Sequence, residues 1–215
     1  MKYLAIFFAT LLAANAHQAL AGGSAKYSVT FDGTWSAATH PMEYPSGAHF
    51  SGLIGATHNG GYAVFKDKGA ATDGLERLAE MGAHSPLDAE IRKAVADGKA
   101  GALLESGPIF GPPGMSSITF EIDDKHPMVS LVAMIAPSPD WFTGAANVNL
   151  MEGGNWVGEK SVTVYAWDAG TDSGTTYKAG DADMAPRGPV VANGSKHFMK
   201  DGKPVAVGTL TFKKM

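Results

Sequence analysis

Three aspartates beside glycine and tryptophan are the residues of this chain whose types and spacing could hold a ligand. Asp168 and Asp172 lie four residues apart in Trp167–Gly174 (WDAGTDSG), and Asp140 lies in Ile135–Gly144 (IAPSPDWFTG). Hard cations such as Ca²⁺ take six to eight oxygen ligands from carboxylates, backbone carbonyls and water. Because glycine permits turns that strain other residues, the DAGTD segment allows two carboxylates to converge. A third carboxylate, from Asp140, would complete a site made by two loops.

An ordinary turn is the competing interpretation of the same residues. Aspartate beside glycine is the usual composition of a type I turn or an Asx turn, which needs no ligand. An EF-hand loop is excluded, because Gly170, Ser173 and Ala179 stand at positions 3, 6 and 12 counted from Asp168. Spacing alone leaves both interpretations open and favours the turn.

Catalytic motifs are absent from the sequence. It has no G-x-S-x-G, no glycine-rich phosphate loop and no H-E-x-x-H. His40, His49 and His58 recur every nine residues, a pattern that suggests zinc. An odd spacing places side chains on opposite faces of a strand, however, and turn sequences separate the three. We therefore expect them to bond to nearby backbone or to face solvent, and we expect no enzyme; a metal-assisted hydrolytic site on the aspartates is the alternative.

The first 21 of the 215 residues have the pattern of a secretory signal peptide. Met1-Lys2 is a short basic region, Tyr3–Ala14 is an apolar run, and Ala19-Leu20-Ala21 is a cleavage site. The run is shorter than the roughly 20 apolar residues that span a membrane. We expect residues 1–21 to be cleaved, residues 22–215 to form one domain, and the protein to be secreted or periplasmic.

The composition of the remaining chain excludes several classes of protein. Removing residues 1–21 takes away one lysine and leaves 16 basic and 21 acidic residues, a net charge of −5 without a basic patch. We therefore expect no nucleic acid partner. Cysteine is absent, so disulfides and thiolate metal sites are excluded. No later segment has the length and apolarity of a transmembrane helix.

Short alternating segments between glycines and prolines predict a mostly β structure. The segments 27–31, 62–65, 118–122 and 162–165 alternate between apolar and polar residues, and residues 205–212 suit a closing strand. Residues 128–135 (MVSLVAMI) are nearly all apolar, which indicates a strand buried on both faces. Residues 105–116 form a loop rich in proline and glycine.

A helical insertion at about residues 74–98 interrupts the strand pattern. Residues 75–81 are followed by Gly82, a typical helix stop. Ser85 and Pro86 then suit the cap and first position of a second helix, and Leu87, Ile91 and Val95 continue it at helical spacing. The predicted fold is therefore a β domain with a small helical insertion.

Several motifs in order along the chain resemble the spondin domain, the module of F-spondin and mindin. The matching segments are THP-x-x-YP, SPDW and WDAGTDSG, together with residues 30–45, 48–65 and 74–82. They run from about Phe31 to Tyr177. The resemblance implies an antiparallel β-sandwich that binds Ca²⁺ through the aspartates of SPDW and WDAGTD, which here are Asp140, Asp168 and Asp172.

The resemblance also suggests a role in adhesion, with an unknown surface protein or glycan as the partner. The animal members carry disulfides and thrombospondin-type repeats, and this chain has neither. A structural envelope protein that uses calcium only for stability is the third possibility. We expect Trp141 and Trp167 to pack beneath the ion-binding loops.

Overall fold

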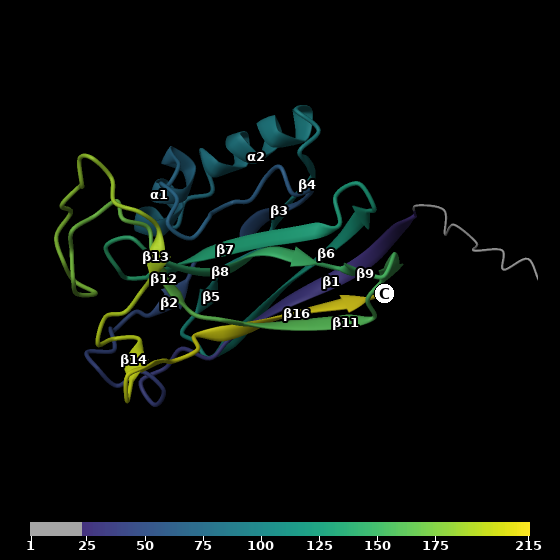
Figure 1. Ribbon diagram of the computed structural model, residues 1–215. Coiled ribbons are helices and arrows are strands. Elements are labelled where there is room, and N and C mark those ends of the chain that lie inside the picture. Colours follow the sequence, from purple (N-terminus) through teal and green to yellow (C-terminus); the bar gives the residue numbers. More distant parts are fainter. Residues whose placement is uncertain (1–22) are drawn as a thin grey trace, which may run out of the picture.

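Two antiparallel sheets packed face to face, with a helical layer outside one of them, make up the protein (Figure 1). The structure is a computed structural model and describes residues 23–215. The predicted signal peptide lies outside the described residues. The predicted class, a mostly β antiparallel sandwich with a short helical insertion, is confirmed.

The first sheet has four strands in the order β11-β16-β1-β6. Their bounds are β1 (Ser24–Gly33), β6 (Gly114–Asp123), β11 (Glu159–Val164) and β16 (Gly208–Lys214). In β1 the side chains of Tyr27, Val29 and Phe31 are buried and alternate with more exposed residues. One face of the strand therefore packs in the core and the other meets solvent, as the alternating sequence predicts.

The second sheet has eight strands and is built around β7. The order is β13-β12-β8-β7-β2-β5, and β3 pairs with both β7 and β4. The bounds are β2 (His49–Phe50), β3 (Ile54–His58), β4 (Ala100–Glu105), β5 (Ile109–Phe110), β7 (Met128–Ala136), β8 (Trp141–Asn149), β12 (Ala166–Asp168) and β13 (Val191–Ala192). Two short hairpins complete the strands: β9 (Met151–Glu152) with β10 (Asn155–Trp156), and β14 (Met199–Lys200) with β15 (Lys203–Pro204).

Two helices, α1 (Asp73–Met81) and α2 (Leu87–Ala96), form the layer above the second sheet in Figure 1. The Thr72 side chain accepts a hydrogen bond from the Leu75 N–H and caps α1, which ends at Gly82 in the left-handed conformation (φ 65°). The predicted cap of the second helix is wrong. Pro86 takes that position, and no side chain caps the helix.

The buried apolar residues fall into two clusters, one on each side of the second sheet. Tyr27, Phe50 and Trp141 belong to the cluster between the sheets, and Leu78 and Phe142 belong to the cluster beneath the helices. Strand β7 contributes to both clusters, and all of its residues after Met128 are buried. This explains its nearly continuous apolar sequence, because a strand covered on both faces has no solvent side.

One predicted strand is wrong. Residues 62–65 contain a single bend, at Val64, and no strand. Phe65 is nevertheless buried, because it packs against Phe142 and Trp167 with ring centroids 5.1 Å apart in both pairs. Val64 is buried beside it in the cluster beneath the helices, so burial in this segment does not alternate. The closing strand also begins later than predicted, at Gly208.

Candidate metal centre

Asp140 and Asp168 lie at the same end of the second sheet because β8 and β12 are antiparallel neighbours. In the register, Asp168 faces Trp141, the residue after Asp140. The Ala169 N–H donates to the Asp140 backbone oxygen over 3.2 Å, so the pairing continues past the end of β12. Strand pairing therefore brings the SPDW and WDAGTD segments together, as the two-loop hypothesis requires.

The Asp140 carboxylate is fully buried, with an exposed fraction of 0%. Its Oδ2 accepts hydrogen bonds from the Thr171 N–H (2.8 Å), the Asp172 N–H (3.2 Å) and the Thr171 hydroxyl (3.4 Å). Its Oδ1 is also buried but has no hydrogen-bond partner. A buried carboxylate oxygen without a partner is costly, and a cation would satisfy it.

Burial and neighbouring negative charge act together on this carboxylate. Burial is the larger cause and the charge of Asp168 the next, and together they raise the pKa of Asp140 to about 6 against the opposing hydrogen bonds from Thr171 and Asp172. Burial likewise raises the pKa of Asp168, opposed by hydrogen bonds from the Gly170 N–H and the Trp141 side chain. The protein thus holds acids close together where their ionised forms are disfavoured without a counter-charge.

Asp168 and Asp172 also form the turns that their glycine neighbours predict. Asp168 Oδ1 accepts from the Gly170 N–H (3.0 Å), and Asp172 Oδ1 accepts from the Gly174 N–H (2.6 Å). Gly170 has φ 71°, a conformation that favours glycine. The turn interpretation is therefore correct, and the same turn directs the Thr171 and Asp172 N–H groups at Asp140.

A second group of carboxylates surrounds Asp172. Among residues 23–215, one set of three possible ligands has its atoms within 4.8 Å of one another: Asp172, Asp181 and Asp183. Asp172 pairs with Asp183 in an isolated antiparallel bridge, and its Oδ2 accepts from the Ala182 N–H (2.7 Å). Asp140 and Asp168 are not in this set. The D-x-D sequence at 181–183 is the signal that could have pointed to it.

An acid-lined pocket of about 610 Å³ lies between these loops and α1. Burial raises the pKa of Glu80 on α1, and Glu80 Oε1 is buried without a partner. The sequence does not predict this role for Glu80, because a glutamate in a helix has no neighbouring sequence pattern that indicates burial beside a pocket. The lining residues are Asp73, Glu76, Arg77, Glu80, Met81, Pro86, Ser138, Pro139, Asp172, Ala179, Gly180, Asp181 and Asp183.

The two tryptophans beside the aspartates support the loops from below. Trp141 is 1% exposed and packs against Tyr177, His197 and Phe198 in the core between the sheets. Trp167 is half-buried and packs in the cluster beneath the helices. The expected packing is confirmed, and it leaves the β8 and β12 ends firmly anchored.

The three regularly spaced histidines have separate structural roles. His49 Nδ1 lies 2.9 Å from the Gly47 oxygen, and His40 Nδ1 lies 2.9 Å from the Thr39 hydroxyl. His58 is buried, with Nδ1 2.7 Å from the Asn59 oxygen and Nε2 2.7 Å from the Ser130 hydroxyl. The set of neighbouring ligands found in the described part of the chain contains none of these histidines. Nothing in their geometry supports zinc.

The fold places this chain among antiparallel β-sandwich domains, here with buried acids at the strand-end loops, and comparison with known proteins gives the family. The Spondin_N family model matches residues 25–204, so the chain belongs to the spondin family. It is 34% identical to Spondin-2 of Rattus norvegicus over 206 residues and 35% identical to Spondin-2 of Homo sapiens over 202 residues. It is also 35% identical to Spondin-1 of Xenopus laevis over 171 residues.

The chain corresponds to part of each relative. The three alignments cover 88%, 86% and 77% of this chain but 61%, 59% and 21% of the respective relatives. The family assignment agrees with the expectation that the chain is not an enzyme. Within residues 23–215, no helix has both the length and the apolarity to cross a membrane.

Proposed function

We propose that this chain is an exported module that binds Ca²⁺ through Asp140, Asp168 and Asp172 and attaches to a surface or matrix ligand. The observation that carries the metal part is the buried Asp140 Oδ1, which has no partner while acidic neighbours surround it. The ion would neutralise these carboxylates and hold the SPDW and WDAGTD loops in one arrangement.

The chemistry of the available donors fits calcium better than zinc or copper. All three proposed side-chain ligands are carboxylates, and the chain has no cysteine. Oxygen ligands select hard cations, whereas zinc and copper favour imidazole and thiolate. The buried oxygen of Asp140 and the half-buried carboxylate of Asp168 are therefore suited to Ca²⁺. Backbone carbonyls and water would supply the remaining ligands.

The attachment part of the proposal rests on the family. The relatives are spondins, and this chain matches their shared domain along most of its own length. A β-sandwich with ordered end loops presents a rigid surface, which lowers the entropy cost of binding a partner. We propose a surface protein or a glycan as the partner. No described feature favours the metal-assisted hydrolase.

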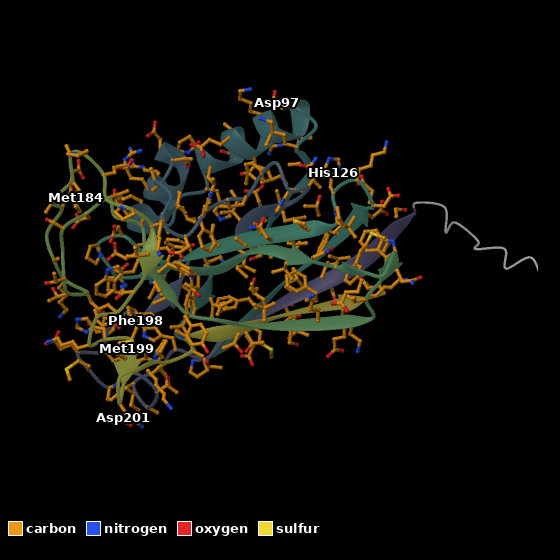
Figure 2. The ribbon with its side chains drawn as sticks, viewed as in Figure 1. Asp97, His126, Met184, Phe198, Met199 and Asp201 are labelled. Atoms are coloured by element: carbon orange, nitrogen blue, oxygen red, sulfur yellow. The ribbon has the colours of Figure 1, made fainter. Side chains whose placement is uncertain are left out.

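A thermal unfolding experiment tests the metal part. Millimolar Ca²⁺ should raise the Tm of residues 22–215 above its value in EDTA by about 5–10 °C, the effect of a ligand at roughly 100 times its Kd on a domain of this size. The double variant Asp168→Asn with Asp172→Asn should lose this gain. Asp201→Asn, at an exposed site in the β14–β15 hairpin (Figure 2), should keep it.

A further variant locates the ion. Asp181→Asn with Asp183→Asn removes the two exposed members of the second acidic group and leaves Asp140 and Asp168 intact. We expect it to retain most of the calcium effect. Equal Tm values in EDTA and in calcium would contradict the metal proposal. Loss of the effect only in the 181/183 variant would move the ion to that second group.

Binding and turnover measurements separate a module from an enzyme. The protein should bind a component of a matrix-protein and glycan panel more tightly in Ca²⁺ than in EDTA. It should show no reproducible metal-dependent turnover on a hydrolase substrate panel. Turnover that disappears in Asp168→Asn would reverse this part of the proposal, and an absence of any panel binding would favour a structural role.

A further inference from the structure

Three histidines, His84, His126 and His197, have both ring nitrogens facing oxygens that can only accept hydrogen bonds at neutral pH. Two of them, His84 and His126, contact the helical layer. His84, between α1 and α2, places Nδ1 2.8 Å from Glu105 Oε1 on β4 and Nε2 3.2 Å from the Gly52 backbone oxygen. Its side chain is 25% exposed. The contact therefore joins the connection between the helices to the sheet beneath them.

His126 repeats this arrangement at the other end of the helical layer. On the turn between β6 and β7, it places Nδ1 3.0 Å from Asp123 Oδ1 and Nε2 3.3 Å from the Gly98 backbone oxygen. Gly98 belongs to the turn that follows α2. Figure 2 shows His126 and Asp97, the residue before Gly98, toward the same end of the molecule.

The protonation state of an imidazole ring decides whether both of its nitrogens can donate hydrogen bonds to the facing oxygens. A neutral ring has one N–H and one lone pair, so it can donate to only one of two oxygens, and its lone pair opposes the other. The imidazolium ring donates from both nitrogens. His58 differs, because the Ser130 hydroxyl can donate to its Nε2 while Nδ1 donates to the Asn59 oxygen. The neutral form satisfies His58, whereas the charged form satisfies His84 and His126.

We propose that protonated His84 and His126 fasten the helical layer to the sheet, and that deprotonation loosens it. The two contacts hold the α1–α2 connection and the turn after α2, so both loops of the layer depend on them. Helix α1 supplies Asp73, Glu76 and Glu80 to the acid-lined pocket. Loosening the layer would therefore also alter the wall of the pocket beside the metal-binding loops.

The charged groups around each histidine agree with a cationic ring. Glu105 from β4 faces His84, and Asp123 from β6 faces His126, both at ion-pair distance. On the other side of His126 lies His58 from β3, whose pKa the His126 charge lowers, after the larger effect of burial. A lowered pKa favours the neutral form of His58, which is the form that its hydrogen bonds to Asn59 and Ser130 suit.

Hydrogen exchange measured separately for each segment tests the proposal. We compare the protection factors of the α1 and α2 amides in the wild type at pH 5.5 and at pH 8. They should fall on the order of tenfold for each histidine whose contact with its carboxylate is lost, because one charge-assisted hydrogen bond has about that effect on an equilibrium. The β7 amides serve as an internal reference. In His84→Gln with His126→Gln, protection of the helices should be low at both pH values.

Two comparisons make the outcome decisive. His49→Gln removes a histidine with one backbone contact and should behave as wild type. Burial raises the pKa of Asp140 to about 6 and also raises the pKa of Glu80 on α1, so part of the pH response is independent of the two histidines. The difference between the double variant and the wild type therefore decides the question. Helix protection that is equal at both pH values in the wild type would overturn the proposal. A double variant whose helix protection changes with pH as much as that of the wild type would also overturn it. If the double variant does not fold, each single variant should lose part of this pH-dependent change in protection.

Discussion

Replacing Asp140 by asparagine should give a protein that is more stable than the wild type above pH 6 in EDTA but no longer responds to calcium. The asparagine oxygen can accept the N–H groups of Thr171 and Asp172 as the carboxylate oxygen does. The substitution removes the buried negative charge and places an amide N–H₂ group where the unpartnered Oδ1 lies, near Asp168. It therefore separates the hydrogen bonds that hold the loop from the charge that we propose binds the ion.

The sign of the pH dependence follows from the raised pKa. Asp140 has a pKa of about 6 in the folded protein against the ordinary value of 3.8 for an aspartate, so folding favours its protonated form. This contribution to stability is fully present below pH 3.8 and is lost as the pH rises through about 6. The asparagine variant lacks that loss, so at pH 8 without calcium it should gain about 2–3 kcal/mol over the wild type.

Urea unfolding between pH 3.5 and pH 8, with and without calcium, measures this effect. The two proteins should differ least near pH 3.5 and most at pH 8 in EDTA. Asp140→Ala is the control, because it leaves the buried Thr171 and Asp172 N–H groups without an acceptor at about 1–3 kcal/mol each. It should therefore be destabilised at every pH. An asparagine variant that is less stable than wild type at pH 8 in EDTA, or still stabilised by calcium, would refute the assignment.

Gly170→Ala should destabilise the protein by about 3 kcal/mol and weaken calcium binding. Gly170 has φ 71°, and a Cβ there would lie 2.7–2.8 Å from backbone atoms of Gly188 and Pro189. The left-handed conformation alone costs alanine about 1 kcal/mol, and relieving a clash with backbone requires the loop to move. That movement would displace the Thr171 and Asp172 N–H groups from Asp140.

A glycine of the same conformation in open surroundings provides the matched control. Gly111 has φ 67°, and nothing lies within 4 Å of the position that a Cβ would take there. Gly111→Ala should therefore show only the conformational cost and a normal calcium response. Urea unfolding and calcium titration of both variants measure the difference. Equal destabilisation of the two would show that contact with Gly188 and Pro189 contributes nothing.

Local patterns predicted the elements whose burial follows one simple rule. The alternation in β1 marks a strand with one buried face, and the apolar run of β7 marks a strand between two cores. The end of α1 at Gly82 was also predicted from the sequence, because Gly82 adopts the left-handed conformation that favours glycine. In each case, residues close together in the sequence determine the structure of the element.

Prediction failed where contacts distant in the sequence decide the structure. Phe65 lies in an alternating segment but is buried through Phe142 and Trp167 rather than through strand pairing. Asp183 reaches Asp172 through a bridge across eleven residues, and Glu80 approaches from α1. No local spacing encodes these approaches, because each depends on how separate elements pack.

The sequence by itself determined the fold class, the family resemblance and the three aspartates that we propose as ligands. It also determined the turns, because aspartate followed by glycine favours them wherever they occur. Only the tertiary structure decided the environment of those aspartates. The register of β8 with β12 places Asp140 beside Asp168, and packing buries Asp140 Oδ1 without a partner. Burial and charge proximity are properties of the assembled chain, and our calcium proposal rests on them.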